Sequence, residues 1–126
     1  MNTKEFKLVV YGISTELGSS PGQVIEPNVT PNFWACKLEH QLFNVFIICS
    51  ENNEWALLDS YDPTKCELNF IDNEMISKAL SSRFGIVLNL KKKLESDFIA
   101  LPSMSENDIK YWRPKNLGEG IFNWWD

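Results

Sequence analysis

Three apolar segments separated by short polar stretches constrain the fold of this 126-residue chain more than any other feature. They span Phe33 to Glu39, Leu42 to Ser50 and Trp55 to Ser60, and β-branched and aromatic residues are frequent in them. The second segment is almost continuously apolar, which is typical of a central strand covered on both faces. Because Glu51 to Glu54 has the composition of a turn, we expect the second and third segments to form an antiparallel hairpin.

Helical periodicity is clearest after this region. Apolar residues recur at three- and four-residue spacing from Met75 to Phe84, Asp72 or Asn73 can cap the first turn, and Gly85 follows the last. These signals predict one main helix over about residues 72–84.

Two shorter helices are indicated near the C-terminus. Ser105 precedes Asp108 by three residues, which resembles a capping pattern and predicts a helix over Ser105 to Tyr111. Asn116 precedes Glu119 by the same spacing, so we expect a short final helix despite two glycines.

The remaining segments complete a single α+β domain over residues 1–126. We predict strands at Phe6 to Ile13, Ile86 to Leu90 and Phe98 to Leu101, although Leu88, Leu90 and Leu94 also fit a helical continuation. Residues 14–32 contain many Gly, Pro and Ser residues and read as a long loop with a short extended piece at Val24 and Ile25. The expected fold is a mostly antiparallel, twisted sheet of about five strands, with the main helix and the short C-terminal helix.

The net charge of −5 is concentrated in one region. Residues 51–74 hold seven acidic residues and one basic residue, whereas residues 77–115 hold eight basic and four acidic ones. A modest negative charge also serves solubility, but such a cluster favours a basic partner and disfavours nucleic acid as the main ligand. The partner-binding residues that we expect are Glu51, Glu54, Asp59, Tyr61, Asp62, Glu67, Asp72 and Glu74, with Trp34, Trp55, Tyr61 or Trp112 as buried anchors.

Catalytic and metal-binding patterns are weak. Cys36 and His40 could pair as nucleophile and base, but a four-residue spacing in a strand does not bring them together as a helix would. Asp59 and Asp62 could act as paired carboxylates, although Asp62-Pro63 is also an ordinary turn. The spacing of the cysteines and the histidine matches no compact zinc site, so we expect a binding protein without enzymatic activity, metal or cofactor.

A single-stranded nucleic-acid-binding domain is the alternative function. Lys91, Lys92 and Lys93, with Arg83, could contact phosphates while sheet aromatics stack on bases. The acidic composition weighs against this alternative, because basic triplets are usually solvated turns.

The longest uninterrupted apolar run, Val45 to Cys49, is far below the ~20 residues of a membrane-spanning helix. The N-terminus shows no secretory signal, and the odd number of cysteines indicates free thiols in a reducing compartment. We therefore expect a cytoplasmic protein that does not contact a membrane.

The C-terminal sequence from Trp112 to Asp126 reads W-R-P-K-N-L-G-E-G-I-F-N-W-W-D. It resembles the W-[KR]-P-x-x-x-G-E-x-[IL]-F-N-x-W-D ending of immunity proteins from bacterial contact-dependent growth inhibition and related polymorphic toxin systems. The resemblance implies an antitoxin that binds the toxic C-terminal domain of a cognate effector and blocks its active site or substrate entry. An acidic inhibitor suits a nuclease toxin, whose substrate-binding face is basic.

The last residues of this tail are too apolar to remain in water, because each large ring contributes a few kcal/mol, on the order of 2, when buried. Ile121, Phe122, Trp124 and Trp125 therefore have to dock on the domain or on a partner. We expect the tail to cover the core of its own domain, and do not place it in the contact surface.

Overall fold

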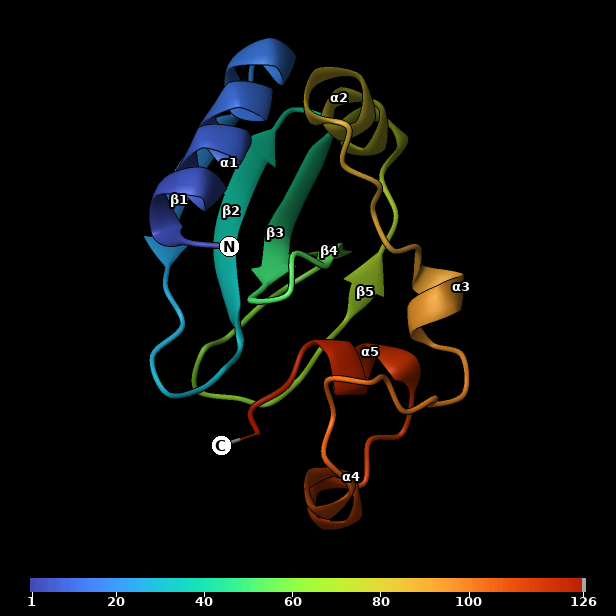
Figure 1. The fold of residues 1–126 in the computed structure, drawn as a ribbon. Helices are drawn as coiled ribbons and strands as arrows, with labels where there is room; N and C mark the ends of the chain where they lie inside the picture. Colours follow the sequence, from blue (N-terminus) through green and yellow to red (C-terminus); the bar gives the residue numbers. More distant parts are fainter. Residues whose placement is uncertain (126) are drawn as a thin grey trace.

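A computed structural model describes residues 1–125 and contains a five-stranded antiparallel sheet with helices on both faces (Figure 1). The strands follow one another in space as they do in the chain, in the order β1-β2-β3-β4-β5. Their bounds are β1 (Ser20–Ile25), β2 (Phe33–His40), β3 (Phe43–Ser50), β4 (Trp55–Leu58) and β5 (Phe70–Ile71). The α+β class expected from the sequence is confirmed.

The central hairpin lies where the sequence predicts it. β3 pairs with β2 along its whole length, with Phe33 opposite Ser50, and then turns through residues 51–54 to pair with β4, with Phe46 opposite Leu58. β3 is the middle strand of the sheet, which explains its nearly continuous apolar sequence.

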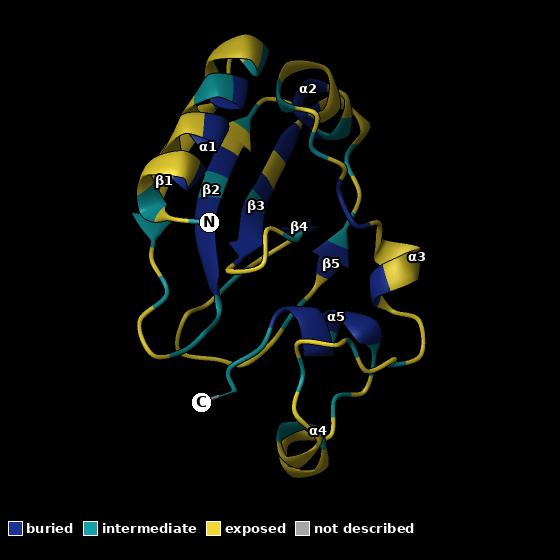
Figure 2. Ribbon diagram, in the orientation of Figure 1, coloured by how far each residue is buried: buried dark blue, intermediate teal, exposed yellow. Residues whose placement is uncertain are grey.

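Alternate residues of the central strands supply two separate cores. In the first core, Trp34, Cys36, Ile47 and other residues of the same parity face α1 (Thr3–Leu17) and α2 (Glu74–Phe84). In the second core, strand residues of the other parity pack against α3 (Lys91–Leu94), α5 (Leu117–Ile121) and the tail. The strands contribute Phe33, Ala35, Ile48, Ala56, Leu58 and Phe70, and the other elements contribute Leu94, Leu117, Ile121 and Phe122. Figure 2 shows α5 largely buried and α4 (Glu106–Trp112) mostly exposed.

The three predicted helices are confirmed, with the caps that the sequence indicates. Asn73 accepts a hydrogen bond from Ile76 N at the start of α2, and Gly85 ends that helix with φ 65°. Ser105 caps α4 through Asp108 N, and Asn116 caps α5 through Glu119 N.

The strand predicted over Phe6 to Ile13 is wrong, because this segment lies inside α1. Its Val, Leu and Tyr content suggested a strand, but Phe6, Val9, Val10 and Ile13 have the spacing of one helical face, and all four are buried. Asn2 caps the helix by accepting from Glu5 N at 2.8 Å. The helical period and the cap therefore outweigh β propensity here.

Residues 14–32 are not only loop, since they include the end of α1 and the edge strand β1. The expected extended piece at Val24 and Ile25 forms the end of β1, where Val24 pairs with Cys36 and Ile25 with Ala35. The pairing register shifts between Pro21 and Val24. An edge strand tolerates proline and a bulge because one side of its backbone needs no partner.

Neither Ile86 to Leu90 nor Phe98 to Leu101 forms a strand. The helical alternative holds in part, because Lys91 to Leu94 forms α3 and buries Leu94. The fifth strand is instead the two-residue β5, whose Phe70 pairs with Leu58. A strand of two residues is too short to show an alternating pattern of apolar and polar residues in the sequence.

The C-terminal tail docks on its own domain, as expected. Phe122 is fully buried and packs edge-on against Phe33, with ring centroids 5.9 Å apart. Trp124 also packs edge-on against Phe33, at 5.5 Å, but it and Trp125 remain partly exposed. Asp126, the last residue of the tail sequence, lies outside the described residues.

Candidate partner-binding surface

The predicted acidic residues are accessible but do not form one patch. Six of the seven acids between residues 51 and 74 are exposed, and Glu54 is half-buried. Glu51 and Glu54 precede β4, whereas Asp59 follows it. Since a strand rises ~3.3 Å per residue, the positions of Glu54 and Asp59 are ~16 Å apart. The acidic residues therefore divide between two ends of the sheet.

At one end lies an open cleft of about 530 Å³, which we call the turn cleft. Glu51 and Glu54 line one side, Asp108 from α4 lines the other, and Ile121 and Trp125 contribute apolar surface. Glu54 is held in place because its carboxylate accepts a hydrogen bond from Asn89 Nδ2 at 2.8 Å. Among the described residues that line it, this cleft has no Lys or Arg.

A second open cleft of about 410 Å³, which we call the loop cleft, separates the β4–β5 loop from the C-terminal tail. Glu67 and Glu119 contribute carboxylates and Lys115 an ammonium group. Aromatic side chains from the tail region form much of its wall: Trp112, Phe122, Trp124 and Trp125.

The tail is the element that the two clefts share. Both Asn123 and Trp125 line each cleft. Together the described residues of the two clefts supply one ammonium group, on Lys115, against five carboxylates, on Glu51, Glu54, Glu67, Asp108 and Glu119. Among the described lining residues, the turn cleft therefore carries a net charge of −3 and the loop cleft a net charge of −1.

Asp59 and Asp62 lie on the β4–β5 loop, outside the lining of both clefts, and both are exposed. Asp62 accepts hydrogen bonds from Thr64 Oγ1 at 2.7 Å and from Thr64 N at 2.9 Å. These two hydrogen bonds lower the pKa of the Asp62 carboxyl group. The turn interpretation of Asp62-Pro63 is thus confirmed, and the Asp62 carboxylate is exposed on the β4–β5 loop.

Asp72 and Glu74 have local partners at the start of α2. Asp72 Oδ1 accepts a hydrogen bond from Lys91 N at 2.9 Å, and Glu74 forms an exposed ion pair with Lys78 at 3.1 Å. Neither residue lines a cleft. Because β5 runs antiparallel to β4, Asp72 and Glu74 lie at the same end of the sheet as Glu54, but outside both clefts.

Two of the four expected aromatic anchors belong to the core. Trp34 and Trp55 are buried against Phe6, and Trp34 Nε1 donates to Thr3 Oγ1 at 2.9 Å. Tyr61 packs its ring against Phe33 and Phe46. Of the four, only Trp112 is exposed, and it lines the loop cleft.

Tyr61 carries a buried hydroxyl group that has no hydrogen-bond partner among the described residues. Burial, with smaller contributions from Cys66 and Asp62, raises the pKa of this phenol. The ring is half-buried against the second core, so Tyr61 anchors the β4–β5 loop to that core.

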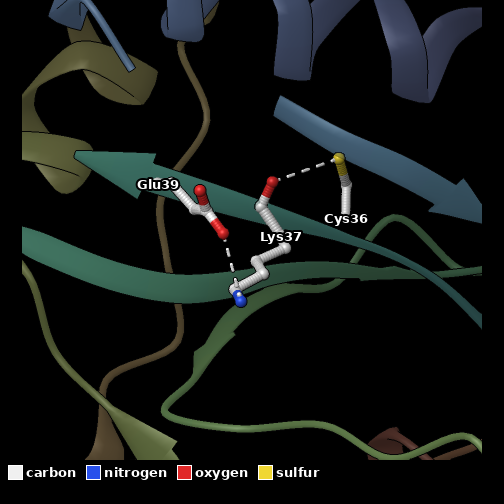
Figure 3. Close-up of polar contacts among 3 residues, drawn as sticks. All are labelled: Cys36, Lys37 and Glu39. Carbon is white, nitrogen blue, oxygen red and sulfur yellow. Dashed lines mark hydrogen bonds and ion pairs between the residues drawn. The ribbon is translucent and has the colours of Figure 1, made fainter. Parts of the chain in front are cut away.

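The Cys36 and His40 side chains are not brought together. Cys36 Sγ lies on the α1 side of β2 within hydrogen-bond distance of Gly22 O and Lys37 O, while Lys37 and Glu39 form an ion pair at 3.2 Å (Figure 3). His40 stacks on Phe43 and accepts from Leu42 N at 3.0 Å. Burial raises the pKa of the Cys36 thiol to about 11, so the thiolate that a nucleophile requires is strongly disfavoured.

Within residues 1–125, no three His, Cys, Asp or Glu side chains are grouped so that they could hold a metal ion. In the same range, no helix is both long and apolar enough to cross a bilayer.

The basic triplet, Lys91 to Lys93, forms the first three residues of α3. Lys91 approaches Glu95 at 3.9 Å, and Lys93 Nζ donates to Asn89 Oδ1 at 2.9 Å. The sheet aromatics that would be needed to stack on bases are buried, including Phe33, Trp34 and Phe70. Helices and the tail cover both sheet faces at these positions.

Sequence reasoning missed Asp108, Glu119, Trp124 and Trp125 as surface residues. The first two lie outside the acidic cluster and join it only through the fold. An extended tail alternates the sides to which neighbouring residues point, so Trp125 falls on the side opposite the buried Phe122. The same alternation places Trp124 on the side of Phe122 and gives no signal for its exposure.

Comparisons of the chain with protein-family models, with curated proteins and with solved structures found no match.

Proposed function

We propose that this protein is a cytoplasmic immunity protein that binds and neutralises the toxin domain of a contact-dependent growth-inhibition effector. The observation that carries the proposal is the charge around the tail, where five carboxylates and one ammonium group line two adjoining clefts. A surface of this kind is complementary to the basic face with which a nuclease binds its substrate. Covering that face would exclude the nucleic acid without any chemical step.

The tail sequence supports the same proposal. Two residues that match the immunity-protein pattern have structural roles in this chain. The Asn123 side chain donates to Gly120 O and accepts from Trp125 N. Gly118 packs directly against Phe70. If immunity proteins share this ending because it stabilises the fold, then cleft residues outside it, such as Glu51 and Glu54, can vary from one immunity protein to another according to the toxin that each binds. This arrangement suits a class of inhibitors that must recognise many different toxins.

Electrostatic steering is the mechanism expected at encounter. Opposite potentials on two proteins raise the association rate, and salt reduces this effect because it screens exposed charges. Asp59 and Asp62, which are exposed near the loop cleft on the β4–β5 loop, would add to the attraction without needing direct contact.

The test uses the toxin domain encoded next to this chain, with an active-site substitution that permits its purification. The E51K/E67K variant should associate on the order of tenfold more slowly at low salt than the unmodified chain. E16K/E26K is the matched control, because all four glutamates are exposed and both variants change the net charge equally.

Equal slowing by both variants would show that net charge, rather than the cleft surface, drives association. Absence of any complex with the neighbouring gene product would reject the immunity function itself.

A further inference from the structure

We infer that the loop cleft is an anchoring site for an arginine side chain of a basic partner protein. The inference rests on the proposed function, because it names the chemical group that the acidic surface receives. It concerns the aromatic wall of the cleft, which charge attraction at a distance does not explain.

The lining of the loop cleft combines two features that favour a guanidinium group, namely aromatic faces and carboxylates. Trp112, Trp124 and Trp125 provide aromatic surface, and none of the three is fully buried. A cation over an indole ring is attracted by its π electrons, and the planar guanidinium stacks on such rings better than an ammonium group does.

Carboxylates stand beside these rings. Glu67 and Glu119 line the cleft, and neither forms an ion pair within residues 1–125. Glu119 Oε1 accepts from Lys115 N at 3.1 Å, which fixes the side chain while Oε2 makes no hydrogen bond among the described residues. Carboxylates at an interface lose favourable hydration unless a donor replaces the water, and a cationic donor does so more strongly than a neutral one.

The surroundings strengthen the preference for a cation. Beyond the shared Trp125, the adjoining turn cleft adds the carboxylates of Glu51, Glu54 and Asp108 and no basic group among its described residues. The volume of about 410 Å³ falls within the ~300–1,000 Å³ typical of sites that bury a ligand. Lys115 offsets one of the two carboxylates of the loop cleft, so one arginine there would meet aromatic faces together with a net negative charge.

The five tryptophans give a direct test by nuclear magnetic resonance. Two of them, Trp34 and Trp55, are in the first core, and the other three line the loop cleft, so their indole N–H signals report on separate places. The probe is the capped peptide acetyl-Gly-Arg-Gly-amide, and its partner is the same peptide with neutral, isosteric citrulline in place of arginine.

Titration with the arginine peptide should shift the Trp112, Trp124 and Trp125 signals to saturation and leave Trp34 and Trp55 unmoved. The citrulline peptide should bind ~3-fold or more weakly, as expected when a cation–π contact is lost. E67Q should weaken binding of the arginine peptide to a similar degree, whereas E106Q, which alters an exposed carboxylate outside both clefts, should not. Unmoved Trp34 and Trp55 signals in each variant verify that it is folded.

Equal binding of the two peptides, or absence of saturable shifts at the three cleft tryptophans, would overturn the inference. These peptide measurements do not require a toxin, so the two proposals can fail separately. Selective arginine binding without any toxin complex would keep the site and reject the immunity function. Unchanged toxin affinity in E67Q and W112A would reject the anchor and keep that function.

Discussion

Asn32 and Asn123 exchange hydrogen bonds across 91 residues of chain and thereby join the start of β2 to the C-terminal tail. Asn32 N donates to Asn123 O at 2.9 Å, and Asn123 N donates to Asn32 Oδ1 at 2.9 Å. Asn32 Nδ2 also donates to Ile121 O at 3.0 Å. The Asn32 side chain thus satisfies one donor and one acceptor of the tail backbone next to the buried Phe122.

We predict that Asn32→Ala lowers the free energy of unfolding by ~1–3 kcal/mol, because two partly buried backbone groups lose their partners. Urea denaturation followed by fluorescence measures the change. Asn28→Ala serves as the control, since Asn28 is exposed and its substitution should stay within ~0.5 kcal/mol of the unmodified chain. Equal stability of the two variants would mean that the Asn32 side chain does not hold the tail.

Gly118 makes a second prediction about the tail. A Cβ atom at this position would lie 2.6 Å from Phe70 Cζ and 3.1 Å from Leu94 O, so α5 can approach β5 only if residue 118 is glycine. We expect Gly118→Ala to cost ~1–3 kcal/mol, although alanine is the better helix former. Combining it with Phe70→Leu should recover part of that loss, and strictly additive losses in urea denaturation would contradict a direct clash.

Local signals were sufficient for much of the fold. The β2–β3–β4 region and the helices α2, α4 and α5 were predictable because their apolar periods and capping residues agree with the final structure. The prediction failed at α1, where Val9 and Val10 have high β propensity but lie on one helical face. It also missed β5, since pairing of Phe70 with Leu58 is determined by tertiary contacts.

The candidate binding surface was less predictable than the fold. The sequence indicated Glu51, Glu54 and Glu67 through their clustering along the chain, but it could not show that β4 separates the first two from the third. The closeness of both groups to Trp125 depends on how the tail crosses the second core. Long-range docking of this kind leaves no mark in local spacing.

The three cysteines should differ sharply in reactivity. Cys66 is exposed, whereas burial raises the pKa of Cys36 to about 11 and that of Cys49 to about 12. Because the thiolate is the reactive form, a chromogenic disulfide reagent at pH 8 should modify one thiol quickly in the folded protein and three in denaturant. Cys66→Ser should abolish the fast phase, and a fast phase that persists in this variant would contradict the assignment.

The same thiols predict how stability depends on pH. In the unfolded chain Cys36 and Cys49 deprotonate near 9.0, whereas in the folded chain their pKa values are raised. The unfolded state therefore binds fewer protons than the folded state above pH 9, and the free energy of unfolding should fall as pH rises from about 9 toward 11. Cys49→Ala should make this decline shallower in urea denaturation at matched pH values, and an unchanged slope would contradict the linkage.

Asn89 connects three elements near the turn cleft. Its Nδ2 group donates to Glu54 Oε2 at 2.8 Å and to Trp55 O at 3.0 Å, and its Oδ1 atom accepts from Lys93 Nζ at 2.9 Å. The residue is buried, at 7% exposure. It therefore both fixes the Glu54 carboxylate and ties the segment before α3 to β4.

Asn89→Asp tests this role, because it replaces the side-chain donor to Glu54 Oε2 and Trp55 O with an acceptor, while the Asn89 N donor to Trp55 O is retained. Lys93 offsets part of the new charge, but burial beside a carboxylate and a carbonyl raises the pKa of the introduced acid above its unfolded value of about 3.9. The variant should thus be closest to the unmodified chain at pH 4 and lose ~1–3 kcal/mol more by pH 7. Urea denaturation at both pH values measures the difference, with the exposed Asn107→Asp as control. A loss that is independent of pH, or shared equally by the control, would show that Asn89 does not act as the donor to Glu54.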